Sequence, residues 1–336
     1  GKGIGAVPMA IGNPDLKWER TLTYNAGLDV VLFSNRWDMT LDWYRKVTDD
    51  LLLDVTKAPS VGTSSAKENI GKLQNNGIEF QTRVTAINNQ NWNWAMSLTI
   101  QHNENKIKKI SNALKAMNEK LNAEKTLLPP PVYEEGQSIS AVKAVKSGGI
   151  DPATGQEVFL TRNGEKTYIW DPLDKVAIGD TEPKLRGSIS SAFTYKNWSV
   201  SLACSYELGA WWYNQTLVDK IENSSAAYNL DRRALSHRWS ENNRNARYKA
   251  ITMTNQDTGM SSRFAQKRNE LSFTSLAIGY RFDPKNFKFL QACRIASMSL
   301  NATMEELGRI SSIRTERGLD YPFARTFNVS LSVLFN

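Results

Sequence analysis

The sequence predicts an all-β chain that forms about nine antiparallel spanning strands, a portion of a larger transmembrane β-barrel. Three observations predict this fold. Many segments alternate strictly between apolar and polar residues, so each strand has one face for lipid and one for water. Short and long connections alternate along the chain. No run of about 18 apolar residues occurs, so a transmembrane helix is excluded.

The last segment shows the alternation most clearly. Its apolar side chains share one face, and the polar Asn328, Ser330 and Ser332 occupy the other. The apolar set comprises Phe327, Val329, Leu331, Val333 and Phe335. A barrel needs such a strand to close its sheet, with one side in lipid and the other facing water or a plug.

The same pattern predicts eight further strands, and their connections fall into two classes. The strands are expected near 18–33, 36–46, 70–87, 92–103, 184–196, 198–213, 272–282 and 291–305. Leu271 and Phe273 are out of phase, which indicates a bulge or an uncertain register. Short connections are expected at 34–35, 88–90, 197 and 283–290, and long ones at 49–68, 104–182, 214–267 and 307–321. Short periplasmic turns and long extracellular loops are typical of membrane barrels, whereas a β-sandwich gives no reason for such sorting.

Residues 104–182 and 214–267 are the two large excursions, expected to be extracellular. In the first, apolar residues recur at spacings of three and four, which predicts one short amphipathic helix. They are Ile107, Ile110, Leu114, Met117 and Leu121. This helix either packs on neighbouring loops or offers a docking face to a partner. Short β-like pieces are expected near 138–146 and 157–170.

Composition limits the partners. The chain has 336 residues, a net charge of +8, ten Trp, eleven Tyr and twelve Phe. The aromatic residues gather near predicted strand ends, as interfacial girdles do, although a soluble β-rich core would also use them. The basic residues are dispersed and no nucleic-acid motif occurs, so we expect no nucleic-acid partner. An odd strand number and a Gly-Lys-Gly start lead us to expect that residues 1–336 are the C-terminal part of a longer protein.

With these segments in place, the chain resembles the C-terminal barrel portion of a SusC/RagA-type TonB-dependent outer-membrane transporter. The resemblance covers nearly the whole chain and rests on the order and spacing of its motifs. These are Asn13 to Glu19, Asp42 to Leu52, Asn69-Ile70-Gly71, Asn76 to Glu79, Gly149 to Gly155, Gly179 to Lys184, Arg238-Trp239, and Tyr321-Pro322 through Asn336.

The resemblance implies a 22-stranded barrel in the outer membrane of a Gram-negative, Bacteroidota-like bacterium. An N-terminal plug domain, missing here with the N-terminal strands, would close the lumen, and the TonB complex would power uptake through that missing part. A SusD-like surface lipoprotein would cap the barrel. The implied cargo is a glycan oligosaccharide, or a peptide as in some relatives. The barrel-assembly machinery would read the final strand through Phe327 to Phe335.

The sequence offers no catalytic chemistry. We find no nucleophile motif, metal-ligand cluster or phosphate loop, so we predict no enzyme, cofactor or metal. Glu79 and Glu207 are interpreted as lumen-facing polar residues. Cys204 and Cys293 lie in non-adjacent strands, which argues against a disulfide.

Cargo-binding candidates are aromatic residues beside polar ones, since sugars stack on rings and bond through their hydroxyls. The first group is Trp211, Trp212, Tyr213 and Asn214, where a strand enters a long loop. Its other interpretation is the outer aromatic girdle. The second group is Arg238 and Trp239, for which ion pairing within the loop is the alternative. Tyr168 and Trp170 form the third.

Two other classes of function stay open at this point. A soluble β-rich glycan-binding module would pack its apolar strand faces against each other. A glycan-cleaving enzyme would need two carboxylates about 5–10 Å apart in a cleft, and the sequence gives no reason to pair any two.

In the longer parent protein, Phe335→Ala is expected to lower barrel assembly more than cargo affinity, because Phe335 belongs to the segment that the assembly machinery would read. Surface levels of the variant and cargo binding per surface molecule measure the two effects separately. A variant that reaches the surface at the normal level would contradict this role.

Overall fold

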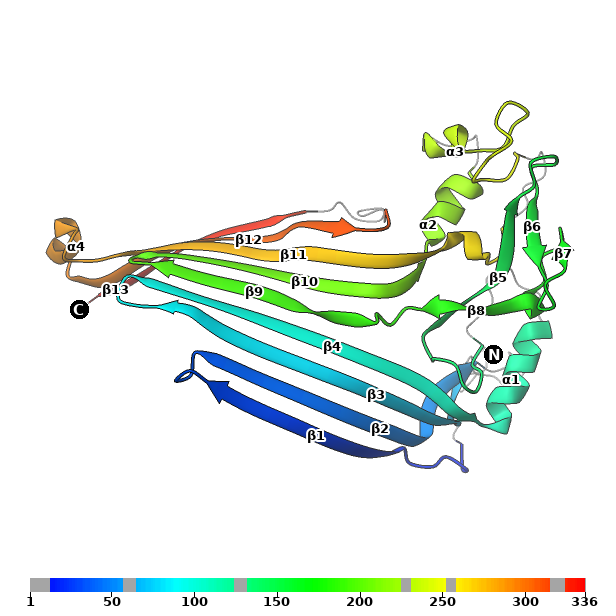
Figure 1. Cartoon of the computed structure of the whole chain (residues 1–336), viewed down its shortest axis with the longest axis horizontal. Helices are drawn as coiled ribbons and strands as arrows, with labels where there is room; N and C mark the ends of the chain where they lie inside the picture. The colour runs from blue at the N-terminus through cyan, green and yellow to red at the C-terminus, as the bar shows by residue number, and fades with distance from the viewer. Residues whose placement is uncertain are drawn as a thin grey trace, which may run out of the picture.

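Nine strands form one continuous antiparallel sheet, as the sequence predicts (Figure 1). The computed structural model describes residues 13–56, 65–123, 132–224, 231–251, 258–314 and 324–335. In spatial order the strands are β1 (Arg20–Leu32), β2 (Trp37–Thr56), β3 (Ser65–Asn88), β4 (Trp92–Ile110), β9 (Leu185–Tyr195), β10 (Trp198–Tyr213), β11 (Ala265–Phe282), β12 (Ile295–Ser311) and β13 (Thr326–Phe335). Within the described residues β1 and β13 are the two edges, so this portion of a barrel is an open sheet.

The register keeps apolar side chains on one face across all nine strands. One row of paired positions runs through Trp94, Phe193, Val200, Ile278, Ala302 and Val329. A row on the opposite face runs through Thr40, Gln81, Thr99, Ser188, Ser205 and Ser272. The apolar face has no protein cover, since Leu28 is 60% exposed and Phe327 66% exposed. This contradicts the soluble module, whose apolar faces would pack together, and fits a lipid-facing wall.

Aromatic rings gather at the end of the sheet that carries the short turns. The ring centroids of Trp92 and Tyr195 lie 4.0 Å apart, and those of Trp198 and Tyr280 lie 4.7 Å apart. Phe282 continues this group with a centroid distance of 4.8 Å to Tyr280. Such a band fits an interfacial girdle. The short helix α4 (Lys288–Ala292) lies at the same end and occupies part of the connection predicted at 283–290.

Several strands continue beyond their predicted ends at the opposite end of the sheet. β2 runs to Thr56, β4 to Ile110, and β11 begins at Ala265. The alternation is lost before the ladder ends, because register shifts interrupt the pairing near Leu51 and near Lys108. Ile107 and Ile110 are buried there, with Leu73 packed against them. The predicted helix was therefore wrong in its first turn: Ile107 and Ile110 belong to β4, and α1 covers Asn112–Ala123. The irregularity near Phe273 is confirmed as a bulge, since the pairing skips Thr274.

The first excursion contains α1 and a second, four-stranded sheet. The order of that sheet is β7 (Lys166–Thr167), β6 (Glu157–Leu160), β5 (Ala141–Ile150) and β8 (Lys175–Asp180), with the 3-10 turn η2 (Pro172–Asp174) before β8. The β-like pieces predicted near 138–146 and 157–170 fall on β5, β6 and β7, while β8 was not predicted. None of the described helices combines the length and the apolar character needed to cross a membrane.

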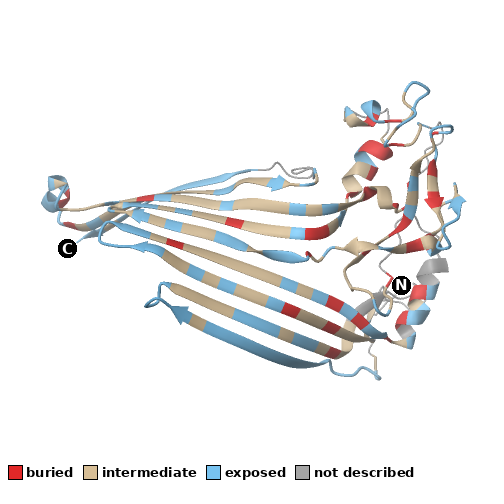
Figure 2. Cartoon of the chain, in the orientation of Figure 1, coloured by how far each residue is buried: buried red, intermediate tan, exposed pale blue. Residues whose placement is uncertain are grey.

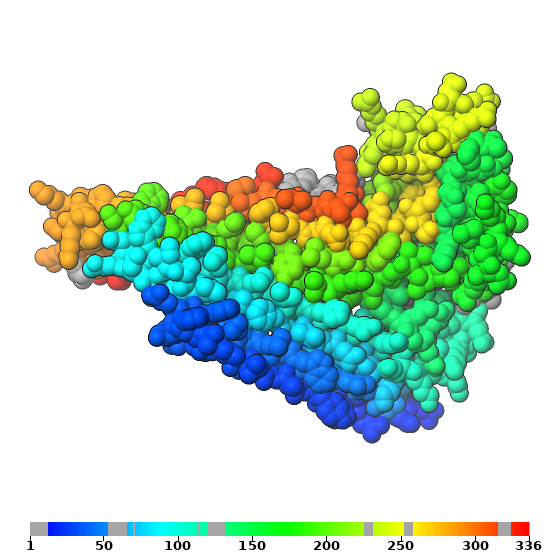
Figure 3. Space-filling view, in the orientation of Figure 1, coloured from blue at the N-terminus to red at the C-terminus, as the bar shows by residue number. Residues whose placement is uncertain are grey.

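The described part of the second excursion contains four short helical segments. They are α2 (Gln215–Leu217), η3 (Val218–Glu222), α3 (Arg233–Ser236) and η4 (Ser262–Phe264). Both excursions lie at the end of the sheet opposite α4, as the predicted sorting requires of them (Figure 1). The other two long connections predicted, 49–68 and 307–321, fall partly on β2, β3 and β12 and otherwise largely outside the described residues. Buried residues gather in the second excursion (Figure 2), and Val218, Ile221, Ala234, Tyr248 and Phe264 form its hydrophobic core. Figure 3 shows the surfaces of the two excursions in contact with each other.

A glycine in β9 lets the side chain of Tyr206 in β10 reach over that strand to β4. The Tyr206 hydroxyl donates to the backbone oxygen of Thr99 at 2.8 Å, passing over Gly187 on the strand between them. A Cβ at Gly187 would lie 2.7 Å from the Tyr206 hydroxyl and 1.9 Å from the Thr99 oxygen. Because that oxygen is backbone, a side chain would force the strands apart.

Gly187→Ala is therefore expected to destabilise the barrel by ~1–3 kcal/mol, the usual cost of overpacking. Gly308→Ala is the matched control, because a Cβ there meets nothing within 4 Å. In the full-length protein, the fraction that keeps its folded mobility on gels at rising temperature measures the effect. Equal melting of the two variants would contradict it.

Candidate functional site

The polar face of the sheet contains a hollow of about 440 Å³ in the middle of β4, β9, β10 and β11. Small side chains create the space. The hydroxyl oxygens of Thr99 and Ser188 lie 2.9 Å apart, and Ser205 pairs with Ser272 across β10 and β11. Arg186 donates to the Gln101 side chain at 3.2 Å. The hollow is thus lined by hydroxyl, amide and charged groups, which suits a polar ligand or another polar protein surface.

Each carboxylate beside this hollow has an arginine partner. Arg268 pairs with Glu207, and Arg309 lies 3.5 Å from Glu270. Glu207 and Glu270 are directly opposite in the β10–β11 register, so these arginines offset their mutual repulsion. Two carboxylates with separate cations are not arranged to share a proton as an acid–base pair. The interpretation of Glu207 as a polar wall residue therefore holds.

A bulge in β10 decides which face the predicted aromatic group occupies. Leu208 and Gly209 together oppose the single residue Asn269, and Gly209 has a left-handed φ of +78°. The bulge shifts the alternation by one residue. Trp212 consequently joins the polar face, where the Arg268 guanidinium lies 5.2 Å from its ring centroid. Of the four residues in the first predicted group, Trp212 is thus placed beside the hollow.

The other three residues of that group contact the excursions. Trp211 lies against Gly179 of β8, where an added Cβ would be 2.1 Å from the indole. Tyr213 makes an edge contact with Phe264 at 6.4 Å. Asn214 is only 3% exposed, and its side-chain amide donates to Gln266 at 3.1 Å while its oxygen caps α2. These contacts join β10 to both excursions and leave Asn214 little surface for a ligand.

Arg238 and Trp239 also hold the excursions together. Arg238 is 6% exposed, and burial lowers the pKa of its guanidinium. It donates mostly to backbone carbonyls rather than to a carboxylate, so the expected ion pair is replaced by backbone hydrogen bonds. Its acceptors are the oxygens of Ala234, Lys249, Ile221, Glu222 and Ser224. The indole of Trp239 donates to Pro152 at 3.0 Å, which links the second excursion to the first.

The third predicted pair is divided between an exposed and a tethered residue. Tyr168 is 53% exposed, and its hydroxyl donates to Asp151 at 2.8 Å. The backbone N–H of Ala153 and then this hydroxyl lower the pKa of the Asp151 carboxyl. Trp170 donates to the backbone oxygen of Met260 at 3.1 Å. The structure does not bring this pair together with Trp212 or Arg238 into one described pocket.

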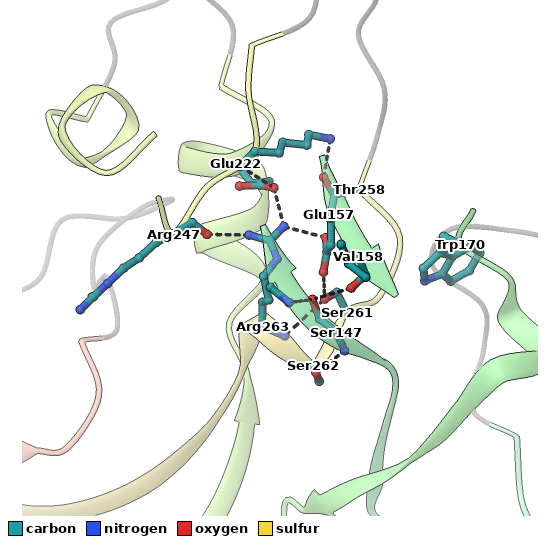
Figure 4. Close-up of polar contacts among 12 residues, drawn as sticks. Ser147, Glu157, Val158, Trp170, Glu222, Arg247, Thr258, Ser261, Ser262 and Arg263 are labelled. Atoms are coloured by element: carbon teal, nitrogen blue, oxygen red, sulfur yellow. Dashed lines mark hydrogen bonds and ion pairs between the residues drawn. The ribbon is translucent and has the colours of Figure 1, made fainter. Parts of the chain in front are cut away.

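A buried charge network joins the excursions, and sequence reasoning did not identify it. Arg263, in η4, donates to Glu157 of β6 at 2.7 Å and to Glu222 of η3 at 2.6 Å (Figure 4). Ser261 donates to the second oxygen of Glu157. The side chains of Glu157 and Glu222 are 4% and 0% exposed. These residues lie 106 and 41 positions from Arg263 and form no motif, so no local pattern could have revealed the network.

Electrostatics explains why the network is stable only as a unit. Burial opposes the charge on Arg263, but the hydrogen bonds and charges of Glu157 and Glu222 outweigh it and raise its pKa. Removing Arg263 would take away the cation that bonds both desolvated carboxylates. Loss of one partner from a buried ion pair costs about 3–5 kcal/mol, whereas exposed pairs contribute about 0–1 kcal/mol.

Arg263→Met is accordingly expected to loosen the excursions while the sheet stays folded. The protease concentration that cuts the excursions should fall at least tenfold, roughly the factor that 1.4 kcal/mol supplies. Arg186→Met serves as a control, because Arg186 is about half exposed and lies 3.6 Å from Glu182. Protease resistance equal to that of the unchanged protein would disprove the role of Arg263.

Comparison with known proteins agrees with this architecture. Residues 3–122 match the family model described as "TonB dependent receptor-like, beta-barrel". The chain is 28% identical to TonB-dependent receptor P3 of Formosa agariphila, over 98% of this chain and 36% of that protein. It is also 28% identical to TonB-dependent receptor SusC of Bacteroides thetaiotaomicron, over 96% of this chain and 32% of that protein.

Solved structures give the same fold. The structure of the RagAB peptide transporter superposes with a TM-score of 0.81 at 22% identity, covering 99% of this chain and 37% of that one. The open-open state of the RagAB peptide importer gives 0.77, also at 22% identity, covering 97% of this chain and 36% of that one. The chain thus spans about a third of the length of its relatives. Residues 3–122 thus match a TonB-dependent receptor β-barrel, and the whole chain has the fold of a nine-stranded part of such a barrel.

Proposed function

We propose that this chain forms part of the wall of a SusC-like, TonB-dependent transporter that imports glycan oligosaccharides across the outer membrane. The two-faced sheet carries this proposal: an uncovered apolar face suits lipid, and the opposite face holds a polar hollow of about 440 Å³. The paired charges beside the hollow and the ring of Trp212 supply the hydrogen bonds and stacking that a sugar requires.

The partners of the whole transporter follow from the same proposal. A SusD-like lipoprotein would cap the end that carries both excursions, which would then be extracellular. Energy from the TonB complex would enter through a plug outside the present chain. The barrel-assembly machinery would read β13, whose Phe327, Leu331 and Phe335 are more than 60% exposed on the apolar face. Outer-membrane lipids would cover that face.

Peptide import is the second candidate, because the structurally similar RagAB is a peptide transporter. The resemblance to RagAB shows the fold alone. Paired arginine and glutamate side chains would serve peptide amides and termini as well as sugar hydroxyls. The two cargoes therefore have to be separated by experiment.

Deletion of the gene for the parent protein is expected to abolish growth on one class of oligosaccharide as sole carbon source, without affecting growth on monosaccharides. Complementation with Trp212→Ala should restore growth with a several-fold higher half-saturating concentration, because removal of one stacking ring costs about 1 kcal/mol. Growth curves over a series of glycan concentrations measure both effects.

Trp43→Ala is the matched control, because Trp43 lies on the apolar face and is 42% exposed, as Trp212 is. It should leave the half-saturating concentration unchanged. Loss of growth on peptides with normal growth on every oligosaccharide would replace the glycan assignment with peptide import. Normal growth on both classes would contradict nutrient import.

A further inference from the structure

A second cavity, separate from the polar face of the sheet, lies where the first excursion meets β10. Its volume is about 200 Å³. Val132, Ile139, Val142 and Met260 give it apolar walls, and Tyr213 closes the side toward β10. Lys143 of β5 and Lys175 of β8 supply its charged groups. An apolar cavity with two ammonium groups is an unusual use of lysine, because burial of an unpaired charge is costly.

The register of the small sheet brings these two lysines together. Lys143 pairs with Ala177, and Lys175 pairs with Val145, so the lysines are diagonal neighbours on one face of β5 and β8. Lys175 is 6% exposed as a whole residue, and the Lys143 side chain is 12% exposed. Both side chains line the cavity.

Among the described residues, the positive charges of the cavity exceed the negative ones. Within the described ranges, the Lys175 ammonium has neither a hydrogen-bond nor an ion-pair partner. The Lys143 ammonium lies 3.5 Å from Glu134 but makes no hydrogen bond. Arg162 lies 3.8 Å from the same carboxylate, so Glu134 is shared. Two cations therefore share one partly exposed anion, and Lys175 adds a third positive charge near them.

The lowered pKa values of both lysines agree with this excess of positive charge. Burial, and then the charge of Lys143, lower the pKa of Lys175 to about 8. Burial also lowers the pKa of Lys143, and Glu134 offsets part of that effect. With a pKa of about 8, roughly nine-tenths of the Lys175 ammonium is still charged at pH 7. The cavity is thus positive at neutral pH.

We propose that this cavity binds an organic acid, with its carboxylate between Lys143 and Lys175 and its carbon skeleton against Val142, Ile139 and Met260. The carboxylate would supply the missing counter-charge and accept the unused hydrogen bonds. The apolar walls favour an organic acid over an inorganic oxyanion, which would leave them without contacts. A sugar acid and a peptide C-terminus share this chemistry and are the two sources to test. The site does not depend on the transport proposed above.

Competitive acylation of lysines tests the site in the full-length protein in detergent at pH 7.5. An amine-reactive ester is added at constant ionic strength, and mass spectrometry gives the rate of modification of Lys143, Lys146 and Lys175. The two probes are galacturonate and N-acetyl-alanine, each compared with its neutral counterpart, galactose or N-acetyl-alanine amide. Sodium sulfate is the inorganic probe.

A carboxylate probe is expected to slow modification of Lys175 by a factor of about 1 + [probe]/Kd, roughly tenfold at ten times Kd, and to spare Lys146. Lys146 lies on the same strand and is exposed. Lys175→Met should remove the protection of Lys143, whereas Lys146→Met should retain the protection of both cavity lysines. Protection by galacturonate alone would identify a sugar acid, and protection by N-acetyl-alanine alone a peptide C-terminus.

Three results would overturn the proposal: no protection by either carboxylate, equal protection by the neutral counterparts, or stronger protection by sulfate than by both carboxylates. Retained protection of Lys143 in Lys175→Met would also overturn it, because the two lysines would then not form one site. Since the assay has no transport step, its failure is distinguishable from failure of the proposed import.

Discussion

The constraint on which this structure depends is the separation of two solvents by a single layer of strands. A wall between lipid and water has to satisfy every backbone hydrogen bond within the sheet and keep apolar side chains on one side throughout. Antiparallel pairing, with the alternation interrupted only at local bulges, meets both demands across nine strands. The residues that a soluble protein would bury remain uncovered here, and the polar side is free to carry small hydroxyl residues and paired charges.

The excursions face a different constraint, because much of their backbone is irregular and has no ladder to satisfy it. Two buried arginines provide the bonds that regular structure would otherwise supply. Arg238 binds carbonyl groups of its own excursion, whereas Arg263 joins carboxylates from both. A guanidinium suits this role because its five donors form a rigid planar fork. The excursions thus form one body with its own core at one end of the sheet.

A bulge in β10 links the large sheet to the packed excursions. The bulge at Gly209 reverses the alternation of β10 just before the strand leaves the sheet. Without it, Trp211 rather than Trp212 would share the polar face with Arg268. With it, Trp211 reaches Gly179 of the small sheet, so one inserted residue both places a ring beside the hollow and attaches the first excursion.

The sequence by itself determined the number of strands, the face of most residues and the sorting of connections. These properties are local, because an alternation such as Phe327 to Phe335, or a short turn such as 34–35, is complete within a few residues. It also located the bulge at Phe273, where the phase visibly breaks. The end of β4 at Ile110 was missed, since an extra residue at Lys108 breaks the alternation and gives Ile107 and Ile110 a helix-like spacing.

Only the tertiary structure decided how the candidate residues are used. The roles of Asn214 and Arg238 depend on partners that no local pattern indicates, and the network of Arg263 depends on Glu157, 106 positions away. The two cavity lysines came together only through the register of a short strand, β8, that the sequence did not reveal. Contacts across such separations follow from how the excursions fold on each other, and a pattern with a period of two residues cannot encode them.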